Sequence, residues 1–125
     1  MERILTLDLG GTAVKAGLFS NGSLEKTTVW RHNYKDCGQN QARDDILTKS
    51  RIFGGNHIAA IGLSVAGLIA SDNTLYRSTV LTSLEGSDIG NFLQRGLSAS
   101  RFSIDNDGDC GAIGEYCLFA ILREI

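Results

Sequence analysis

The chain has 125 residues and a mass of 13.4 kDa, which suits one domain and excludes two complete cores. Hydrophobic residues make up 42% of it and charged residues 21%, so it is neither a disordered nor a collagen-like chain. The formal net charge is -2 and the pI is about 5.6. This balance argues against nucleic acid or an anionic membrane surface as a partner.

Membrane insertion, secretion and disulfide formation all lack a signal in the sequence. The longest apolar run, Tyr116–Leu122, is too short to span a bilayer. Asp8 interrupts the first apolar stretch, and no small-residue cleavage site follows it, so a signal peptide is excluded. The three cysteines form no C-x-x-C pair, which favours reduced thiols over a disulfide framework or a zinc site. We therefore expect a cytoplasmic protein.

The first thirty residues predict three antiparallel strands in a meander. Residues 3–9 alternate and are rich in aliphatic side chains, as in a strand, and Gly10-Gly11 follows as a tight-turn signal. Residues 13–19 form the second expected strand. Asn21-Gly22 is the strongest hairpin signal in the chain, and residues 23–30 carry the third strand.

The rest of the chain alternates helices with strands. A polar loop is expected over 34–40, followed by an amphipathic helix over about 41–53 that Gly54-Gly55 ends. A buried strand over 57–65 and a small hairpin over 68–76 come next. The remaining expected elements are a helix capped by Asp88 and running to Leu97, a short strand over 101–104, and a last helix from about Cys110 to the C-terminus. A meander followed by helix-crossed strands predicts an α/β fold with a mixed five-stranded sheet and flanking helices.

The turn after the first strand is the first segment with chemistry in it. Two glycines at Gly10 and Gly11 let backbone N–H groups approach an oxyanion with no Cβ in the way. Thr12 adds a hydroxyl donor, Lys15 a positive charge, and Asp8 a carboxylate suited to magnesium held through water. A plain hairpin turn explains the glycines equally well. The spacing excludes a Walker loop and a dinucleotide fingerprint.

The acidic segment Asp105–Asp109 precedes the last expected helix. It does not fit an EF-hand calcium loop, because Cys110 and Tyr116 stand where that loop needs glycine and glutamate. One alternative is that these carboxylates cap the helix. The other is a general base for a substrate hydroxyl, since open sheets bind ligands at the carboxyl ends of their strands.

Three motifs in this order resemble the ROK family: DLGGTAVKAGLF over 8–19, IGLSVAGLI over 61–69 and IDNDGDCGAIGEY over 104–116. The ROK family consists of sugar kinases and sugar-responsive repressors with the actin-like ATPase fold, which is ribonuclease-H-like. The resemblance covers essentially the whole chain. It implies ATP and Mg2+ as cofactors in the complete protein and a small-molecule sugar as partner.

The resemblance also implies site residues. The phosphate and magnesium motif matches Asp8, Gly10, Gly11, Thr12 and Lys15, the catalytic aspartate matches Asp107, and the sugar-binding positions match Gly67, Asn106 and Asp107. The implied reaction is transfer of the ATP γ-phosphoryl group to a sugar hydroxyl whose proton passes to Asp107.

The family's second lobe, with its second phosphate motif, adenosine site and Cys/His zinc motif, has no counterpart in these residues. We therefore expect residues 1–125 to be a single N-terminal lobe, inactive alone, with no cofactor or metal bound. The leading hypothesis is a lobe of a kinase that phosphorylates a hexose or N-acetylhexosamine. The alternative is the sugar-sensing lobe of a non-catalytic ROK transcriptional regulator.

The last expected helix is apolar on more than one side. One stripe consists of Ile113, Tyr116, Cys117, Ala120 and Ile121, and Leu118, Phe119, Leu122 and Ile125 continue round the other side. A helix apolar on all sides is normally buried on all sides. We expect the isolated chain to form a homo-oligomer through this helix, on a surface that meets the second lobe in the complete protein.

Overall fold

The computed structural model describes residues 2–106. The elements are β1 (Arg3–Leu9), β2 (Ala13–Ser20), β3 (Ser23–Arg31), the 3-10 turn η1 (Tyr34–Asp36), α1 (Gln39–Gly54), β4 (Ile58–Val65), β5 (Leu68–Ile69), β6 (Leu75–Arg77), the 3-10 turn η2 (Thr82–Leu84), α2 (Ile89–Leu97) and β7 (Arg101–Asn106). The predicted last helix, and the oligomer contact assigned to it, lie outside the described residues.

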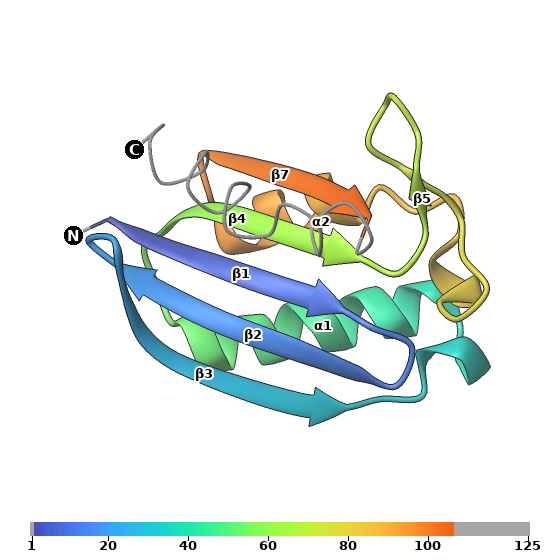
Figure 1. The fold of residues 1–125 in the computed structure, drawn as a ribbon, viewed down its shortest axis with the longest axis horizontal. Helices are drawn as coiled ribbons and strands as arrows, with labels where there is room; N and C mark the ends of the chain where they lie inside the picture. The colour runs from blue at the N-terminus through green and yellow to red at the C-terminus, as the bar shows by residue number, and fades with distance from the viewer. Residues whose placement is uncertain (1, 107–125) are drawn as a thin grey trace.

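Five strands form one mixed sheet in the order β3-β2-β1-β4-β7. The first three make the predicted antiparallel meander, while β4 pairs parallel with β1 and β7 parallel with β4. Figure 1 shows the sheet as one layer, with α1 and α2 both behind it. The predicted α/β fold with a mixed five-stranded sheet is confirmed.

The sequence signals that end the elements act as predicted. Asn21 and Gly22 have φ values of 52° and 83°, as a tight hairpin between right-twisted strands requires. The Asp88 side chain accepts a hydrogen bond from the Asn91 N–H and so caps α2. Gly55 ends α1 in a conformation with positive φ, and its N–H donates to the Arg51 carbonyl.

The two faces of the sheet differ in polarity. Along β1 the buried side chains of Leu5, Leu7 and Leu9 alternate with the half-buried Thr6 and Asp8. The leucine side faces α1 and α2 and forms the core of the described residues. Among residues 2–106, neither helix covers the opposite side, on which Asp8 lies (Figure 1).

The segment after β3 differs from its predicted form. It was expected to be a polar loop over 34–40, but residues 34–36 form η1 and α1 already begins at Gln39. Tyr34 is only 4% exposed and belongs to the hydrophobic core. The burial of Tyr34 depends on contacts with α1, which the residues next to it in the sequence do not reveal.

The described helices include none that is long and apolar enough to cross a membrane.

Candidate functional site

The carboxyl ends of β1, β4 and β7 meet at one edge of the sheet, because these three strands are parallel (Figure 1). The register pairs Leu9 with Val65, and Val65 with Asn106. The turn Gly10–Thr12, which follows β1, therefore lies at the same edge as Asn106. Asp107 follows Asn106 in the sequence and lies outside the described residues. Ligands bind at such edges in open α/β sheets.

Two backbone donors of the turn Gly10–Thr12 have no partner within residues 2–106. Gly10 N–H donates to the Ala13 carbonyl at 3.0 Å. By contrast, the N–H groups of Gly11 and Thr12 make no hydrogen bond with another described residue. Neither glycine has a positive φ, so the turn is not the mirror-image hairpin turn that Gly-Gly commonly adopts. Two adjacent open N–H groups are suited to an anion.

A row of polar residues crosses the sheet just before this edge. Asp8 pairs with Lys15 on one side and with Ser64 on the other, and Ser64 pairs with Asp105. Side chains of paired residues point to the same face, so all four lie on the face opposite α1 and α2. Asp8 and Asp105 are two strands apart, or about 10 Å between backbones.

The charged groups of this row differ in their contacts. The carboxylate of Asp8 and the ammonium of Lys15 make no hydrogen bond or ion pair with the described residues. One oxygen of Asp105 accepts a hydrogen bond from the Asn106 N–H at 2.8 Å. Within residues 2–106, no other group competes with a ligand for Asp8 or Lys15.

Residues 78–82 pack over the ends of β1 and β4. A Cβ built on Gly11 would lie 2.9 Å from the Cβ of Val80, so this close approach requires a glycine. The Ser78 hydroxyl donates to the Ala66 carbonyl at 2.6 Å and accepts from the Leu81 N–H at 2.8 Å. The segment thus fixes the Gly10–Thr12 turn relative to the loop after β4.

Gly67, predicted to lie on a sugar-lining loop, stands two residues after Val65, the last residue of β4. A Cβ at this position would lie 2.5 Å from the Arg77 carbonyl oxygen and 2.7 Å from Leu75 Cδ1. Packing against β6 alone therefore requires a glycine here, whether or not a sugar binds.

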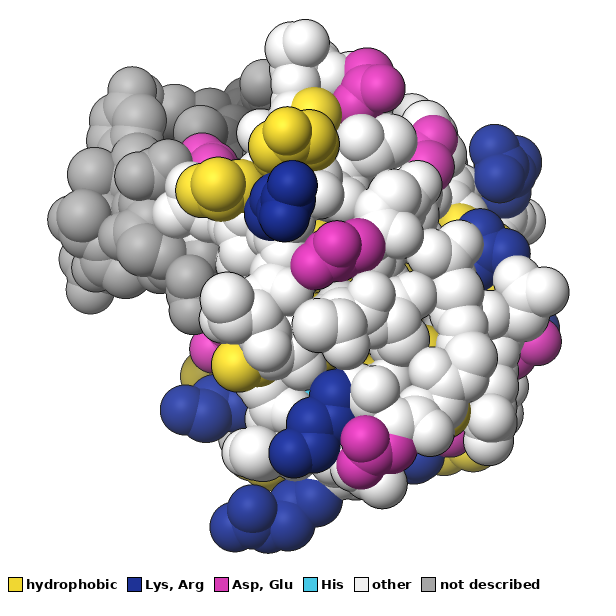
Figure 2. Space-filling view, turned by 90° about the vertical axis from the view of Figure 1, so that its right-hand side faces the viewer, with side chains coloured by type: hydrophobic (Ala, Val, Ile, Leu, Met, Phe, Trp, Pro, Cys, Tyr) yellow, Lys and Arg dark blue, Asp and Glu magenta, His cyan; other side chains and the backbone are white. Residues whose placement is uncertain are grey.

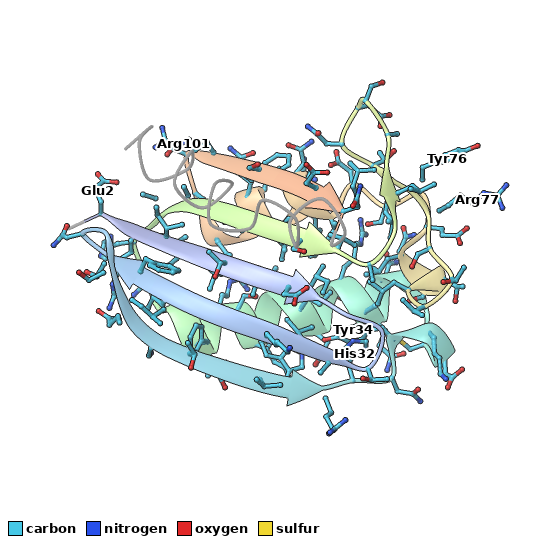
Figure 3. The ribbon with its side chains drawn as sticks, in the orientation of Figure 1. Glu2, His32, Tyr34, Tyr76, Arg77 and Arg101 are labelled. Atoms are coloured by element: carbon cyan, nitrogen blue, oxygen red, sulfur yellow. The ribbon has the colours of Figure 1, made fainter. Side chains whose placement is uncertain are left out.

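Exposed apolar side chains lie on the β5–β6 hairpin and on the segment that follows it. Leu68 is 59% exposed, Tyr76 62% and Val80 38%. Figure 2 views the edge directly and shows exposed hydrophobic groups beside basic and acidic ones, with the two charge signs interspersed. Figure 3 shows Tyr76 and Arg77 pointing away from the body of the fold, and His32 beside the end of the β1–β2 hairpin.

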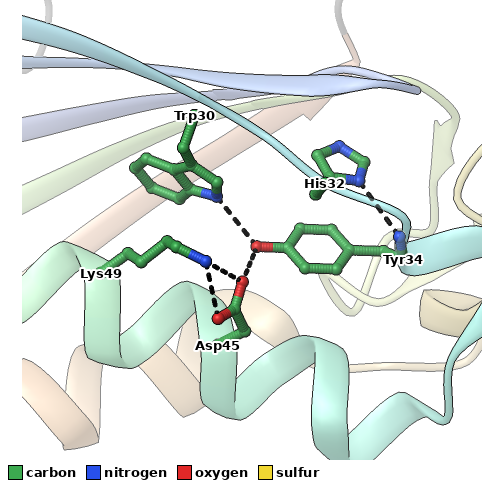
Figure 4. Close-up of polar contacts among 5 residues, drawn as sticks. All are labelled: Trp30, His32, Tyr34, Asp45 and Lys49. Atoms are coloured by element: carbon green, nitrogen blue, oxygen red, sulfur yellow. Dashed lines mark hydrogen bonds and ion pairs between the residues drawn. The ribbon is translucent and has the colours of Figure 1, made fainter.

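A polar cluster connects the end of β3 to α1 (Figure 4). The Tyr34 hydroxyl donates to Asp45 Oδ2 at 2.7 Å and accepts from Trp30 Nε1 at 3.0 Å. Lys49 Nζ lies 2.8 Å from both carboxylate oxygens of Asp45. His32 stacks on the Tyr34 ring, with centroids 3.9 Å apart.

Burial and the hydrogen bond to Asp45 raise the pKa of the Tyr34 phenol well above its usual value, so it stays a donor at neutral pH. Burial of Asp45 favours its neutral form. Hydrogen bonds from Lys49 and Tyr34 outweigh that effect and hold the pKa of Asp45 below its usual value.

We expect Asp45→Asn to lower the free energy of unfolding at pH 7 by about 1 kcal/mol, because the partly exposed pair is screened by solvent. Because folding lowers the pKa of Asp45, its carboxylate stabilises the fold at pH values above the pKa of the unfolded state. This contribution is lost as the pH falls through the pKa of the folded state. Urea unfolding should therefore show that the wild type loses stability below about pH 4, and that Asp45→Asn loses less over the same pH range.

Asp44→Asn is the matched control, since Asp44 is exposed on the same helix and makes no ion pair among the described residues. Equal losses in the two variants at pH 7 would contradict a specific role for the Asp45 cluster.

The structure thus brings together Asp8, Gly10, Gly11, Thr12, Lys15, Gly67 and Asn106 at or near one edge. No group of three or more potential metal-ligating side chains occurs within residues 2–106. Sequence reasoning missed His32, Tyr34 and Asp45. Only the Asp45–Lys49 pair carried a signal, the i,i+4 spacing of opposite charges on a helix.

Comparison with known proteins gives similarity in structure but not in sequence: no family model and no curated protein sequence matches the chain. A ROK hexokinase from Thermus thermophilus superposes with a TM-score of 0.72 at 21% identity, over 91% of this chain and 38% of that one. A ROK family glucokinase from Streptomyces griseus, solved with glucose and AMPPNP, gives 0.72 at 18% identity, over 91% and 36%.

A ROK family transcriptional regulator, described as a homologue of the E. coli MLC protein, gives a TM-score of 0.76 at 15% identity, over 90% of this chain and 30% of that one. The chain therefore spans 30–38% of the length of these three structures. These matches confirm the resemblance predicted from the three motifs. The chain has the actin-like fold of the ROK sugar kinases and of a ROK transcriptional regulator.

Proposed function

We propose that the chain is the N-terminal lobe of a ROK-type sugar kinase, which transfers the γ-phosphoryl group of ATP to a hydroxyl of a hexose or N-acetylhexosamine. The observation that carries the proposal is the sheet edge at which the Gly10–Thr12 turn and the end of β7 lie together. Two open N–H groups at Gly11 and Thr12 suit phosphate oxygens there.

The residues present also fit the cofactors that the family uses. The Asp8 carboxylate has no partner among the described residues and suits a magnesium ion held through water. Lys15, its register neighbour, offers a positive charge to phosphate. ATP and Mg2+ supply the phosphoryl group and offset its charge, while these residues bind and orient it.

Asp107 is the proposed catalytic base, and Asn106 with Gly67 the proposed sugar-contacting positions. In this proposal Asp107 accepts the proton of the attacking sugar hydroxyl, and Asn106 holds a neighbouring hydroxyl. β7 ends with Asn106 at the edge that carries the Gly10–Thr12 turn, and Asp107 is the next residue in the sequence. Donor phosphate and acceptor hydroxyl then meet at the carboxyl ends of the parallel strands.

The second candidate is the sugar-sensing lobe of a regulator, favoured by the structural match to a ROK transcriptional regulator at a TM-score of 0.76. The gene on either side of this segment separates the two. A winged helix encoded upstream favours the regulator, and a glycine-rich second lobe encoded downstream with no such helix favours the kinase.

The test of the proposed function is ADP release by the complete protein, assayed with MgATP and a panel of hexoses and N-acetylhexosamines. We expect sugar-dependent ADP release with at least one of these sugars. Sugar binding without ADP release across the panel would replace the kinase proposal with the regulator.

We expect the isolated 125-residue chain to phosphorylate no sugar and to bind ATP weakly at most, because phosphoryl transfer depends on positioning both substrates. The same panel assay on the purified chain checks this, with the complete protein as the positive control. Measurable sugar phosphorylation by the chain alone would contradict the proposal that the nucleotide site needs a second lobe.

A further inference from the structure

One residue, His32, holds both ends of the turn that the proposed function assigns to phosphate. Its Nε2 lies 2.7 Å from the Gly10 carbonyl oxygen, and its backbone N–H donates to the Thr12 carbonyl at 3.0 Å. The Gly10 carbonyl accepts from this side chain rather than from the Ala13 N–H, the partner it has in a closed two-residue hairpin. The imidazole therefore takes the place of a turn hydrogen bond.

The partners of the ring determine where its proton lies. Nδ1 accepts a hydrogen bond from the Tyr34 N–H at 3.2 Å, so this nitrogen carries a lone pair. The proton of the neutral ring is then on Nε2, which donates to the Gly10 carbonyl. Stacking on Tyr34, whose hydroxyl is bonded to Asp45 on α1, fixes the plane of the ring (Figure 4).

This contact also sets the direction of a backbone donor. In a planar trans peptide, the carbonyl of one residue and the N–H of the next point in opposite directions. With the Gly10 carbonyl directed at His32, the Gly11 N–H is directed away from the imidazole. The contact thus keeps the first of the two open donors unpaired and oriented outward from β3.

We propose that His32 is a positioning residue, which holds the Gly10–Gly11 peptide so that the Gly11 N–H is presented to a phosphate oxygen of the donor nucleotide. The inference rests on the proposed function for the identity of the ligand. It assigns His32 no contact with substrate, because His32 acts through its two contacts with the turn.

Two substitutions separate the donor role of the ring from its packing. In His32→Gln the amide nitrogen occupies about the place of Nε2 and still donates to the Gly10 carbonyl. In His32→Asn the shorter amide accepts from the Tyr34 N–H, as Nδ1 does, but does not reach Gly10. Tyr34→Phe is the control for stability, because it removes the hydroxyl bonded to Asp45 and leaves the contacts of His32 with the turn.

The experiment titrates the 15N-labelled chain with magnesium tripolyphosphate and follows the amide signals of Gly11 and Thr12. We expect weak, saturable shifts in the wild type, in His32→Gln and in Tyr34→Phe. In His32→Asn the affinity should fall about tenfold, the usual effect of one lost hydrogen bond to a binding element. Restored binding in His32→Gln is the result that a purely structural role does not produce.

Equal affinity of His32→Asn and the wild type would overturn the proposal, as would His32→Gln binding as weakly as His32→Asn. Absence of any shift at Gly11 in the wild type would overturn it too. The kinase proposal is tested separately by ADP release from the complete protein. A chain that binds tripolyphosphate in a His32-dependent way, in a protein that phosphorylates no sugar, would end the kinase proposal and the assignment of a donor nucleotide, and would leave the positioning role of His32 standing.

Discussion

Replacing Asp107 by Asn in the complete protein should abolish sugar phosphorylation while largely preserving sugar affinity. The amide keeps much of the shape and hydrogen bonding of the carboxylate but cannot accept the proton of the sugar hydroxyl. Loss of a general base typically lowers kcat by ~10²–10⁴. The measurement is ADP release at saturating MgATP and sugar, together with sugar binding by calorimetry.

Asp109→Asn is the matched control, because it removes a second carboxylate from the same acidic segment. We expect this variant to turn over like the wild type. Normal turnover of Asp107→Asn would show that Asp107 caps a helix and is not the base. Equal losses in the two variants would point to the charge of the segment as a whole.

Gly67→Ala should destabilise the chain by about 1–3 kcal/mol, the usual cost of overpacking. The new methyl group would lie 2.5 Å from the Arg77 carbonyl oxygen, a backbone atom that moves only if β6 moves. Displacing β6 also disturbs Ser78, which bonds to the Ala66 carbonyl. Urea unfolding followed by circular dichroism gives the change in free energy.

Gly38→Ala is the comparison for this variant, since a Cβ at Gly38 meets no atom within 4 Å. Gly38 is the N-cap of α1, where alanine is less favourable than glycine by under about 1 kcal/mol. If the two variants lose the same free energy, the close contact at Gly67 does not determine the residue there.

The sheet could be predicted from the sequence because its signals are local. Asn21-Gly22 sets a turn within two residues, Asp88 caps the helix that begins at the next residue, and β4 is mostly apolar. Strand order then follows from short connections and from helices that cross between parallel strands. The Gly10–Thr12 turn and the end of β7 lie at one edge because β1, β4 and β7 are parallel.

The roles of individual site residues could not be predicted in this way, because they depend on contacts between distant segments. Gly11 suggested a phosphate-binding turn, yet the structure adds a steric reason from Val80, a residue far along the chain. Tyr34 stands in a polar stretch, yet it is buried in the core and its hydroxyl is bonded to Asp45 on α1. The bond from His32 to Gly10 crosses from β3 to the first turn and leaves no periodic signature.

The central place of β4 also has a consequence for how the chain folds during synthesis. The three-stranded meander forms from neighbouring residues, but its apolar face has no cover until α1 emerges, and β1 has no second partner until β4 does. Closing the β1–β4 pair spans a whole helix, which makes it the slow, non-local step.

The nascent chain therefore exposes the leucines of β1 until α1 emerges, and it exposes an unpaired edge of β1 until residue 65 leaves the ribosome. We expect translation products that stop short of Val65 to aggregate, whereas those that extend through β7, the second partner of β4, remain in solution. Because this edge stays exposed until the α1–β4 crossover is complete, we expect translation pauses at synonymous codons, or chaperone binding, to affect the yield of folded protein most in that part of the sequence.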